Sequence, residues 1–470
     1  IANDIVVANC SEFVFLNETS CNLASFNLLK FHTDNKFNGE AFARGAEAMI
    51  TAMEILVGYA DYPTAAITQN SYDYRPLGLG YTNLGALLMT LGLPYDSKEG
   101  RTLAATITAL LHATSYRQSA KIASNELIGP FAGYAKNKEP MQKVMQKHAG
   151  ATSNINSALL EDQTLLDLAN NTFQECLELG NKYGYRNAQA TLLAPVGTIS
   201  FMMDSDTTGV EPDLALVKYK KLVGGGLLKM VNGSVLTALQ KLGYDQKTRE
   251  LIQEYINAND TIEGCELLQP EHLPVFDCSF SPANGTRSID WRGHIKMLGA
   301  TQPFLSGSIS KTINMPKNAT VEDIESAYRM GWELGCKAIA VYRDGCKESQ
   351  PMSTSLTQAV SGNQGLAAAP SGNTRPHLAK RKLPKDRLSK THKFRIGENE
   401  GYLVVGMYEN GDPGEIFVIM SKAGSSLQGF TNTIAILISL ALQHGVPLEN
   451  IVDKLSHTTF APNGFTGEKD

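Results

Sequence analysis

Long helical segments alternate with short apolar stretches, and this alternation constrains the fold of the chain most strongly. Apolar residues recur with helical spacing over residues 38–59, 84–93, 99–125, 159–182 and 320–336. The last of these begins at Thr320-Val-Glu-Asp323, a pattern typical of a capping box. Residues 191–200 are predicted to form a strand ending in a glycine loop, and residues 338–342 a short buried strand. Strands that alternate with helices predict an α/β architecture.

A change in composition divides the chain. The length of 470 residues is enough for two or three domains. Ser, Thr, Gln, Gly, Ala and Pro dominate residues 347–390, which end in Lys and Arg, and we expect a linker there. Three strands at residues 394–396, 402–407 and 415–420, followed by helices at 432–444 and 448–456, predict a small α+β domain over residues 391–470.

Charge and cysteine content exclude several classes of protein. The net charge is −5, from 42 Lys and Arg against 47 Asp and Glu, which gives no basic excess for binding nucleic acid. No apolar run approaches the ~18 residues of a membrane span, and no signal peptide is visible. None of the seven cysteines forms a C-x-x-C pair, so we expect no metal site. These features predict a reduced, cytoplasmic protein.

The first group of residues that could carry chemistry is Cys10-Ser11-Glu12. On an extended strand, Cys10 and Glu12 point to the same side. The thiol could act as a nucleophile or carry a hydrogen atom, and the carboxylate could act as a base. Taken alone the pattern is weak, because a single cysteine near a glutamate is more often structural.

Several further motifs stand in one order along the chain. The stretch Cys10-Ser-Glu-Phe-Val-Phe-Leu-Asn-Glu-Thr-Ser-Cys21 is followed by Arg75-Pro-Leu-Gly-Leu-Gly80, a turn or tight packing element, and by Ala194-Pro-Val-Gly-Thr-Ile199. Motifs at residues 204–212, 271–278, 300–316 and 339–345 complete the set. Together they resemble the ribonucleotide reductases, most closely the adenosylcobalamin-dependent class II enzymes. The fold that this resemblance implies is the C-terminal portion of the reductase α/β barrel, over residues 10–346.

The resemblance also implies roles for single residues. Cys10 matches the cysteine that becomes a thiyl radical and removes the ribose 3′ hydrogen, and Glu12 matches the base for the 3′-hydroxyl proton. Cys21 matches one of two cysteines that reduce the substrate as a disulfide forms, with its partner in an N-terminal half that this chain lacks. Substrate-binding residues are then expected at Ser11 and in a phosphate loop formed by Pro195, Val196, Gly197, Thr198 and Ile199.

The implied activity is the reduction of ribonucleotides, with diphosphates expected as substrates and triphosphates left open. The implied cofactor is adenosylcobalamin, and a thioredoxin-like protein would be the reductant. A homodimer is a further possibility. The alternatives are an inactive half that needs an upstream polypeptide and a class I-type large subunit. A glycyl-radical enzyme is disfavoured because the chain has no C-terminal Arg-Val-x-Gly-Tyr motif.

The residues before Cys10 depart from the reductase pattern. The family has Asn-Pro immediately before the radical cysteine, whereas this chain has Ala8-Asn9. Residues 1–9 instead resemble the last strand of an intein, which implies a splice junction between Asn9 and Cys10. Ala8 replaces the usual histidine of such a junction. The alternative is a divergent reductase N-terminus.

The other cysteines and the histidines have no evident chemical role. We expect structural burial of five cysteines: Cys176, Cys265, Cys278, Cys336 and Cys346. His294, His377 and His457 are interpreted as structural or surface residues, because no histidines show metal-ligand spacing.

Overall fold

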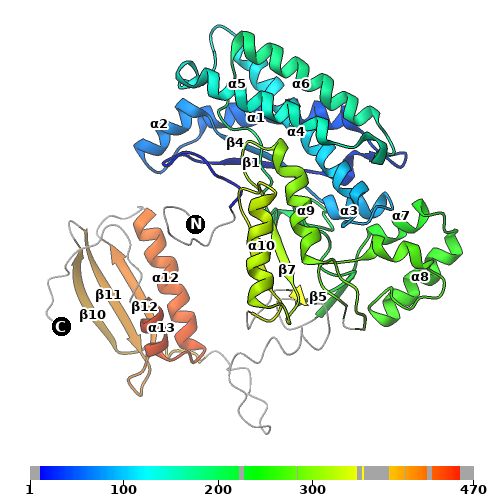
Figure 1. Cartoon of the computed structure of the whole chain (residues 1–470). Helices are drawn as coiled ribbons and strands as arrows, with labels where there is room; N and C mark the ends of the chain where they lie inside the picture. The colour runs from blue at the N-terminus through cyan, green and yellow to red at the C-terminus, as the bar shows by residue number, and fades with distance from the viewer. Residues whose placement is uncertain are drawn as a thin grey trace. The chain divides into compact units, whose positions relative to one another are not determined.

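A computed structural model of the chain describes residues 11–221, 227–282, 284–346, 352–353, 381–396, 399–420 and 426–455. The chain divides into two compact units, Ile1–Ala367 and Ala368–Asp470, which are described separately (Figure 1). Cys10, Asn9, His377 and His457 lie outside the described residues.

A series of parallel strand segments organises the first unit. Strand β1 (Asn22–Asn27) pairs in parallel with β4 (Leu77–Thr82). Leu79 of β4 then forms a parallel bridge with Thr191, and Leu193 forms another with Ile309. Strand β7 (Thr312–Met315) pairs in parallel with β8 (Ala340–Arg343). These segments neighbour one another in chain order, and the predicted α/β architecture is confirmed.

Helices connect these parallel segments (Figure 1). Their bounds are α1 Gly39–Tyr59, α2 Ala65–Tyr74, α3 Leu84–Thr90, α4 Lys98–Ala123, α5 Tyr134–Gly150, α6 Thr164–Tyr183, α7 Ser234–Lys241, α8 Gln246–Asn259, α9 Trp291–Thr301 and α10 Val321–Glu333. At the start of α10, the Thr320 side chain accepts the Asp323 amide and the Asp323 carboxylate accepts the Thr320 amide. The predicted capping box is therefore confirmed.

Glycines allow the central strands to approach closely. Residues 75–80 run mostly within β4 rather than forming a turn. A Cβ atom on Gly80 would collide with the Leu192 carbonyl oxygen, and one on Gly78 would collide with the Leu192 side chain. The tight packing predicted for this stretch is confirmed, because only glycine leaves room for the neighbouring segment.

Three hydrophobic clusters hold the first unit together. The largest is built mainly from α1, β4, α3, α4, α6 and α9. A second lies around α7, α8 and residues 262–278. The third is small and contains Cys21 with Leu192, Ala194 and Val196.

A smaller antiparallel sheet belongs to the same unit. Its order is β6 (Leu227–Val231), β5 (Val217–Lys221) and β9 (Met352–Ser353). Strand β9 lies inside the segment that the composition predicted to be a linker. Two shorter strands, β2 (His32–Thr33) and β3 (Lys36–Phe37), form a hairpin before α1.

The second unit is a three-stranded antiparallel sheet with helices. Its strands are β10 (Ser389–Ile396), β11 (Asn399–Met407) and β12 (Pro413–Met420), and its helices are α12 (Ser426–Gln443) and α13 (Leu448–Leu455). The Ser439 hydroxyl of α12 accepts the Ile416 amide of β12 at 2.9 Å, so the helix packs on the sheet. The Arg381 amide donates to the Gln443 carbonyl at 2.9 Å, which places residue 381, expected in the linker, within this unit.

Two burial predictions were wrong. Strand β8 is not buried, because Ala340 and Arg343 at its ends are exposed. It pairs only with β7 among the described strands, so only one edge is covered. Cys346 is also exposed, because it lies in a turn just after β8, whereas Cys176, Cys265 and Cys278 are buried and Cys336 is half-buried.

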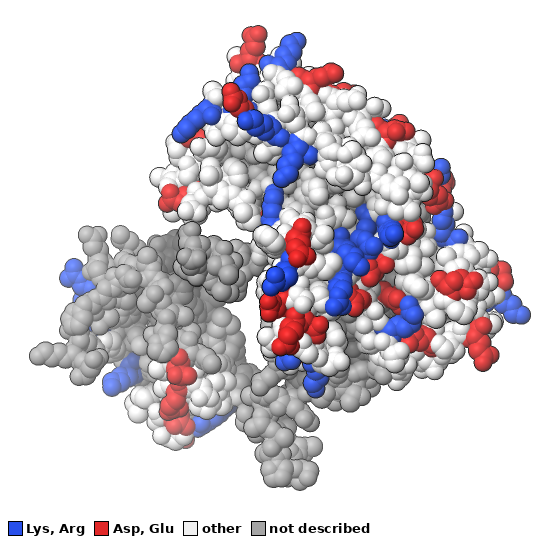
Figure 2. All heavy atoms as spheres, in the orientation of Figure 1, with Lys and Arg blue, Asp and Glu red and all other residues white. Residues whose placement is uncertain are grey.

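Three further observations concern charge, membrane-spanning helices and metal-binding groups in the described residues. Acidic and basic side chains are interspersed over the face in Figure 2. In the part of the chain that the structure describes, no helix is long and apolar enough to cross a membrane. The same residues contain no group of three or more His, Cys, Asp or Glu side chains that could hold a metal ion.

Candidate active site

The backbone around Glu12 is fixed by a loop between α9 and β7. Ser11 has a left-handed backbone with φ of +70°, which is uncommon for a residue other than glycine. The Ser308 amide donates to the Glu12 carbonyl at 2.8 Å. A Cβ atom on Gly307 would lie 3.1 Å from that carbonyl oxygen and 2.8 Å from the Leu192 Cβ. Glycine at residue 307 therefore lets three chain segments meet.

The Glu12 carboxylate is buried without a full set of partners. Its residue is 8% exposed, and its Oε2 atom has no hydrogen-bond partner among the described residues. The buried Ser308 hydroxyl also has none. Burying a polar atom without a partner costs free energy, so such atoms commonly mark a binding or catalytic site. Both atoms are available to a ligand that carries hydroxyl groups.

Cys21 lies close enough to Glu12 to sense its charge. The residue stands immediately before β1 and packs in the small cluster with Leu192, Ala194 and Val196. The Ser20 amide donates to the Ser71 hydroxyl at 3.0 Å, which anchors the segment to α2. Burial, and secondarily the negative charge of Glu12, raise the pKa of the Cys21 thiol to about 12. The thiol is therefore protonated near neutral pH.

The predicted phosphate loop follows the segment against which Cys21 packs. Val196 is buried with a φ of +47°, and it precedes a short 3-10 helix at Thr198–Phe201. The Ser200 amide donates to the Gly197 carbonyl at 3.2 Å. Gly197, Thr198 and Ile199 are exposed at the start of this turn, where amides lack acceptors within the turn. The structure thus has an exposed turn where the sequence predicted a glycine loop, and phosphate binding there stays a prediction.

A buried polar network at the ends of β1 and β4 holds the next loop. Asn27 donates to the Met203 carbonyl at 2.9 Å, and Asn83 donates to the Asn27 side-chain oxygen at 3.0 Å. The Thr207 amide in turn donates to the Asn83 side chain at 2.9 Å. Ligands of open parallel sheets bind beyond the carboxyl ends of the strands. Sequence reasoning assigned no role to Asn27 or Asn83, because these partners lie between 56 and 176 residues away along the chain.

A second buried group was also missed. The side chain of Lys311 is fully buried and forms an ion pair with Glu211. Lys311 Nζ also contacts His294 Nδ1 at 2.8 Å, so His294 lies in the core. Burial lowers the pKa of Lys311, with Glu211 opposing this, and burial and Lys311 hold the pKa of His294 well below its usual range. The sequence signal for this group is a single lysine next to a strand, which reveals no partner.

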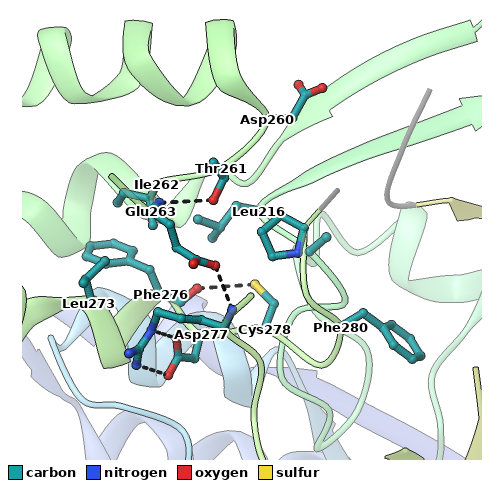
Figure 3. Close-up of a pocket in the computed structure, with 13 residues that line it drawn as sticks. Leu216, Asp260, Thr261, Ile262, Glu263, Leu273, Phe276, Asp277, Cys278 and Phe280 are labelled. Atoms are coloured by element: carbon teal, nitrogen blue, oxygen red, sulfur yellow. Dashed lines mark hydrogen bonds and ion pairs between the residues drawn. The ribbon is translucent and has the colours of Figure 1, made fainter. Parts of the chain in front are cut away.

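A cavity elsewhere in the first unit is lined mainly by apolar side chains, together with Glu263, Asp277 and Arg287, which are linked by hydrogen bonds (Figure 3). Arg287 donates to both carboxylate oxygens of Asp277 at 2.7 Å. The Glu263 carboxylate accepts the Arg287 amide at 2.8 Å. The cavity of about 20 Å³ has room for about one water molecule. It is too small for a nucleotide.

The first unit is an α/β domain in which the Cys21 thiol senses the charge of the buried Glu12 carboxylate. Sequence comparison gives the family. The model of the ribonucleotide reductase barrel domain matches residues 2–342, and that of the TSCPD domain matches residues 374–469. The chain therefore belongs to the ribonucleotide reductase family. The expected fold, a portion of the reductase barrel plus a small C-terminal domain, is confirmed.

The chain is similar to several vitamin B12-dependent reductases. It is 53% identical to the vitamin B12-dependent ribonucleotide reductase of Rhodopirellula baltica, over 98% of this chain and 44% of that protein. It is 44% identical to the protein of that name from Streptomyces clavuligerus, over 98% of this chain and 48% of that protein. A vitamin B12-dependent ribonucleoside-diphosphate reductase of Mycobacterium tuberculosis is 27% identical, over 73% of this chain and 42% of that protein. The chain thus spans about half the length of these relatives.

Proposed function

We propose that the protein to which this chain contributes reduces ribonucleotides to deoxyribonucleotides by thiyl-radical chemistry. The observation that carries the proposal is the buried Glu12 carboxylate, with an unpartnered oxygen, close to the protonated Cys21 thiol. A base and a reducing thiol are two of the groups that the removal of a ribose hydroxyl as water needs, together with a radical and a second thiol. The names of the relatives favour class II, with adenosylcobalamin as cofactor.

Each of the candidate site residues has a distinct role in the proposed reaction. The thiyl radical of Cys10 takes the 3′ hydrogen atom of the ribose and later returns it. Glu12 accepts the 3′-hydroxyl proton, for which its free Oε2 is available. The 2′ hydroxyl leaves as water, and the two electrons and two protons come from Cys21 and a second thiol as they form a disulfide. Ser11 and the turn from Pro195 to Ile199 would hold the substrate, with backbone amides toward its phosphates.

Cobalamin would supply the radical that activates the thiol. The unpartnered atoms at the site are Glu12 Oε2 and the Ser308 hydroxyl, which suit the hydroxyl groups of a nucleotide and do not by themselves make a corrin site. We therefore assign none of the described residues to the cofactor. The residues present fit the substrate side of the reaction.

The remaining partners are also part of the proposal. An upstream polypeptide supplies the second thiol, a thioredoxin-like protein reduces the disulfide, and the assembled enzyme is a cytoplasmic homodimer acting on ribonucleoside diphosphates. The name of the M. tuberculosis relative supports the diphosphate. The competing proposal is that this chain is an inactive half until it is joined to the upstream polypeptide. It agrees with the finding that the chain spans about half the length of its relatives. A class I-type subunit is disfavoured because these relatives are named B12-dependent.

The test is deoxyribonucleotide formation with adenosylcobalamin and dithiothreitol, using the chain alone and the chain joined to its upstream polypeptide. We expect activity only from the joined protein, and its loss in Glu12→Gln and Cys21→Ser. Parallel assays with diphosphates and triphosphates identify the substrate. Activity that survives Cys21→Ser with a thioredoxin-like reductant would contradict the role of Cys21. No product from the joined protein would refute the function.

We also propose that residues 1–9 are an intein remnant, with Asn9 and Cys10 at the splice junction. The support is the Val-Val-Ala-Asn9 sequence before Cys10. The barrel-domain match includes residues 2–9 and so supports the alternative, a divergent reductase segment. Co-expression with the upstream polypeptide, followed by mass spectrometry, separates the two. A ligated product without residues 1–9 is expected, and an unligated chain refutes splicing.

A further inference from the structure

Three consecutive carbonyl groups converge on one lysine. Lys337 Nζ donates to the carbonyl oxygens of Leu305, Ser306 and Gly307, at 3.1, 2.9 and 2.9 Å. An ammonium group has three hydrogens to donate, so this arrangement uses all of them. The residue lies between α10 and β8, and it is exposed overall although its ammonium group is turned onto the loop.

The other side of the same loop holds Glu12. The Ser308 amide donates to the Glu12 carbonyl at 2.8 Å, and the Gly307 amide donates to the Thr191 carbonyl at 2.8 Å. The loop therefore lies between the Lys337 ammonium group and the backbone of the proposed base. Gln302 adds a second contact, because its amide group donates to the Gly307 carbonyl at 3.1 Å.

The charge of Lys337 is not used in an ion pair with any described residue. The charged and titratable groups that act on it or sense it are Lys147, His112 and His148, all of them bases. Partial burial, and secondarily Lys147, lower the pKa of Lys337 to about 8. Burial and the neighbouring base Lys147 disfavour the charged form of Lys337, and the hydrogen bonds to the three carbonyl oxygens offset this cost. Its contacts thus point to a role in orienting the loop.

We infer that Lys337 is a positioning residue for Glu12. Its ammonium group orients the carbonyl groups of Leu305, Ser306 and Gly307, and the Ser308 amide then fixes the Glu12 backbone. This inference rests on the proposed function of Glu12 as the base. Lys337 itself takes no part in the reaction, and it holds the Glu12 carboxylate in position for the substrate.

The variants to compare are Lys337→Met, Lys337→Arg and a control, Lys143→Met, at an exposed position in α5. Hydrogen exchange of the peptide that contains Ser308 is measured by mass spectrometry on each chain. We expect exchange at Ser308 to be about tenfold faster in Lys337→Met, since a hydrogen bond from a charged donor contributes ~1.5 kcal/mol or more. Lys337→Arg and Lys143→Met should exchange like the wild type below pH 8. Above pH 8, the wild type should exchange faster than Lys337→Arg, because arginine keeps its proton.

Activity is measured on the same variants joined to the upstream polypeptide. In Lys337→Met we expect kcat to fall about tenfold with little change in KM, and Lys337→Arg to recover most of it. Unchanged exchange and kcat in Lys337→Met would overturn the inference, and so would a fall in kcat with unchanged exchange. If the wild-type enzyme makes no deoxyribonucleotide, the proposed function fails, and the exchange experiment still tests the loop.

Discussion

Glu54 of α1 joins three parts of the first unit through buried charges. Its carboxylate accepts hydrogen bonds from Arg75 Nε, from Arg186 Nε at 2.7 Å and from the Asn187 side chain at 2.8 Å. The side chains of Glu54, Arg75 and Arg186 are 9%, 8% and 18% exposed. The group ties α1 to the start of β4 and to the segment that leads to Thr191.

We predict that Glu54→Gln destabilises the first unit by about 3–5 kcal/mol. Glutamine keeps the shape of the side chain but leaves two nearly buried guanidinium groups without a counter-charge, and breaking a buried ion pair costs on this order. The matched control lies on the same helix. Glu40 pairs with Arg44 at 3.6 Å, and both side chains are at least 69% exposed, so Glu40→Gln should cost ~0.5 kcal/mol or less.

Urea unfolding followed by tryptophan fluorescence measures the difference. The two tryptophans of the chain, Trp291 and Trp332, both lie in the first unit, so the signal does not report on the second. Added salt should remove the small effect of Glu40→Gln and leave that of Glu54→Gln, because buried charges are screened less. If the two variants unfold within ~1 kcal/mol of each other, the buried group does not stabilise the fold as we reason.

Two further predictions concern the strands and the thiol. Gly80→Ala should destabilise the first unit by ~1–3 kcal/mol or more in the same urea assay, because its Cβ atom would collide with the Leu192 backbone. The control, Gly58→Ala, has no neighbour closer than 3.5 Å to its Cβ atom and should be neutral or slightly stabilising. Equal effects of the two substitutions would contradict the close approach of β4 to Leu192. The rate of Cys21 alkylation by iodoacetamide, followed by peptide mass spectrometry, should rise with pH toward about 12. In Glu12→Gln the rate should be several-fold higher, because a negative charge that raises the thiol pKa is removed. An unchanged rate would show that the two groups do not interact.

Local signals predicted the secondary structure well where they were complete within a few residues. The capping box at Thr320 and Asp323 is such a signal, since both partners lie within one helical turn. Periodicity placed α1 over residues 38–59 against the observed Gly39–Tyr59. Burial failed for residues 338–342, because an apolar strand looks the same in sequence whether one or both of its edges are paired.

Long-range polar groups could not be predicted from one sequence. Lys311 and Glu211 are 100 residues apart, and Asn27 meets the carbonyl of Met203 176 residues away. The local sequence around each of these residues does not distinguish it from an ordinary polar residue on the surface. Only the fold brings such partners together, and a single sequence carries no signal for a contact of that range.

The site itself was found by resemblance rather than by pattern. A cysteine two positions before a glutamate is common, and Cys21 alone looks like a small buried side chain. The structure adds that Cys21 senses the charge of Glu12, which motif reading does not give. The assignment of Cys10 stays a prediction, because the residue lies outside the described part of the chain.

The electrostatic coupling between Glu12 and Cys21 suggests an order of events in the proposed reaction. The negative charge of Glu12 raises the pKa of the Cys21 thiol, after the larger effect of burial. While Glu12 is ionised and ready to accept a proton, Cys21 therefore stays a protonated thiol. Once Glu12 takes the substrate proton, its charge is neutralised and Cys21 can lose its own proton more easily. Loss of this electrostatic interaction, once the base has acted, thus favours oxidation of the Cys21 thiol.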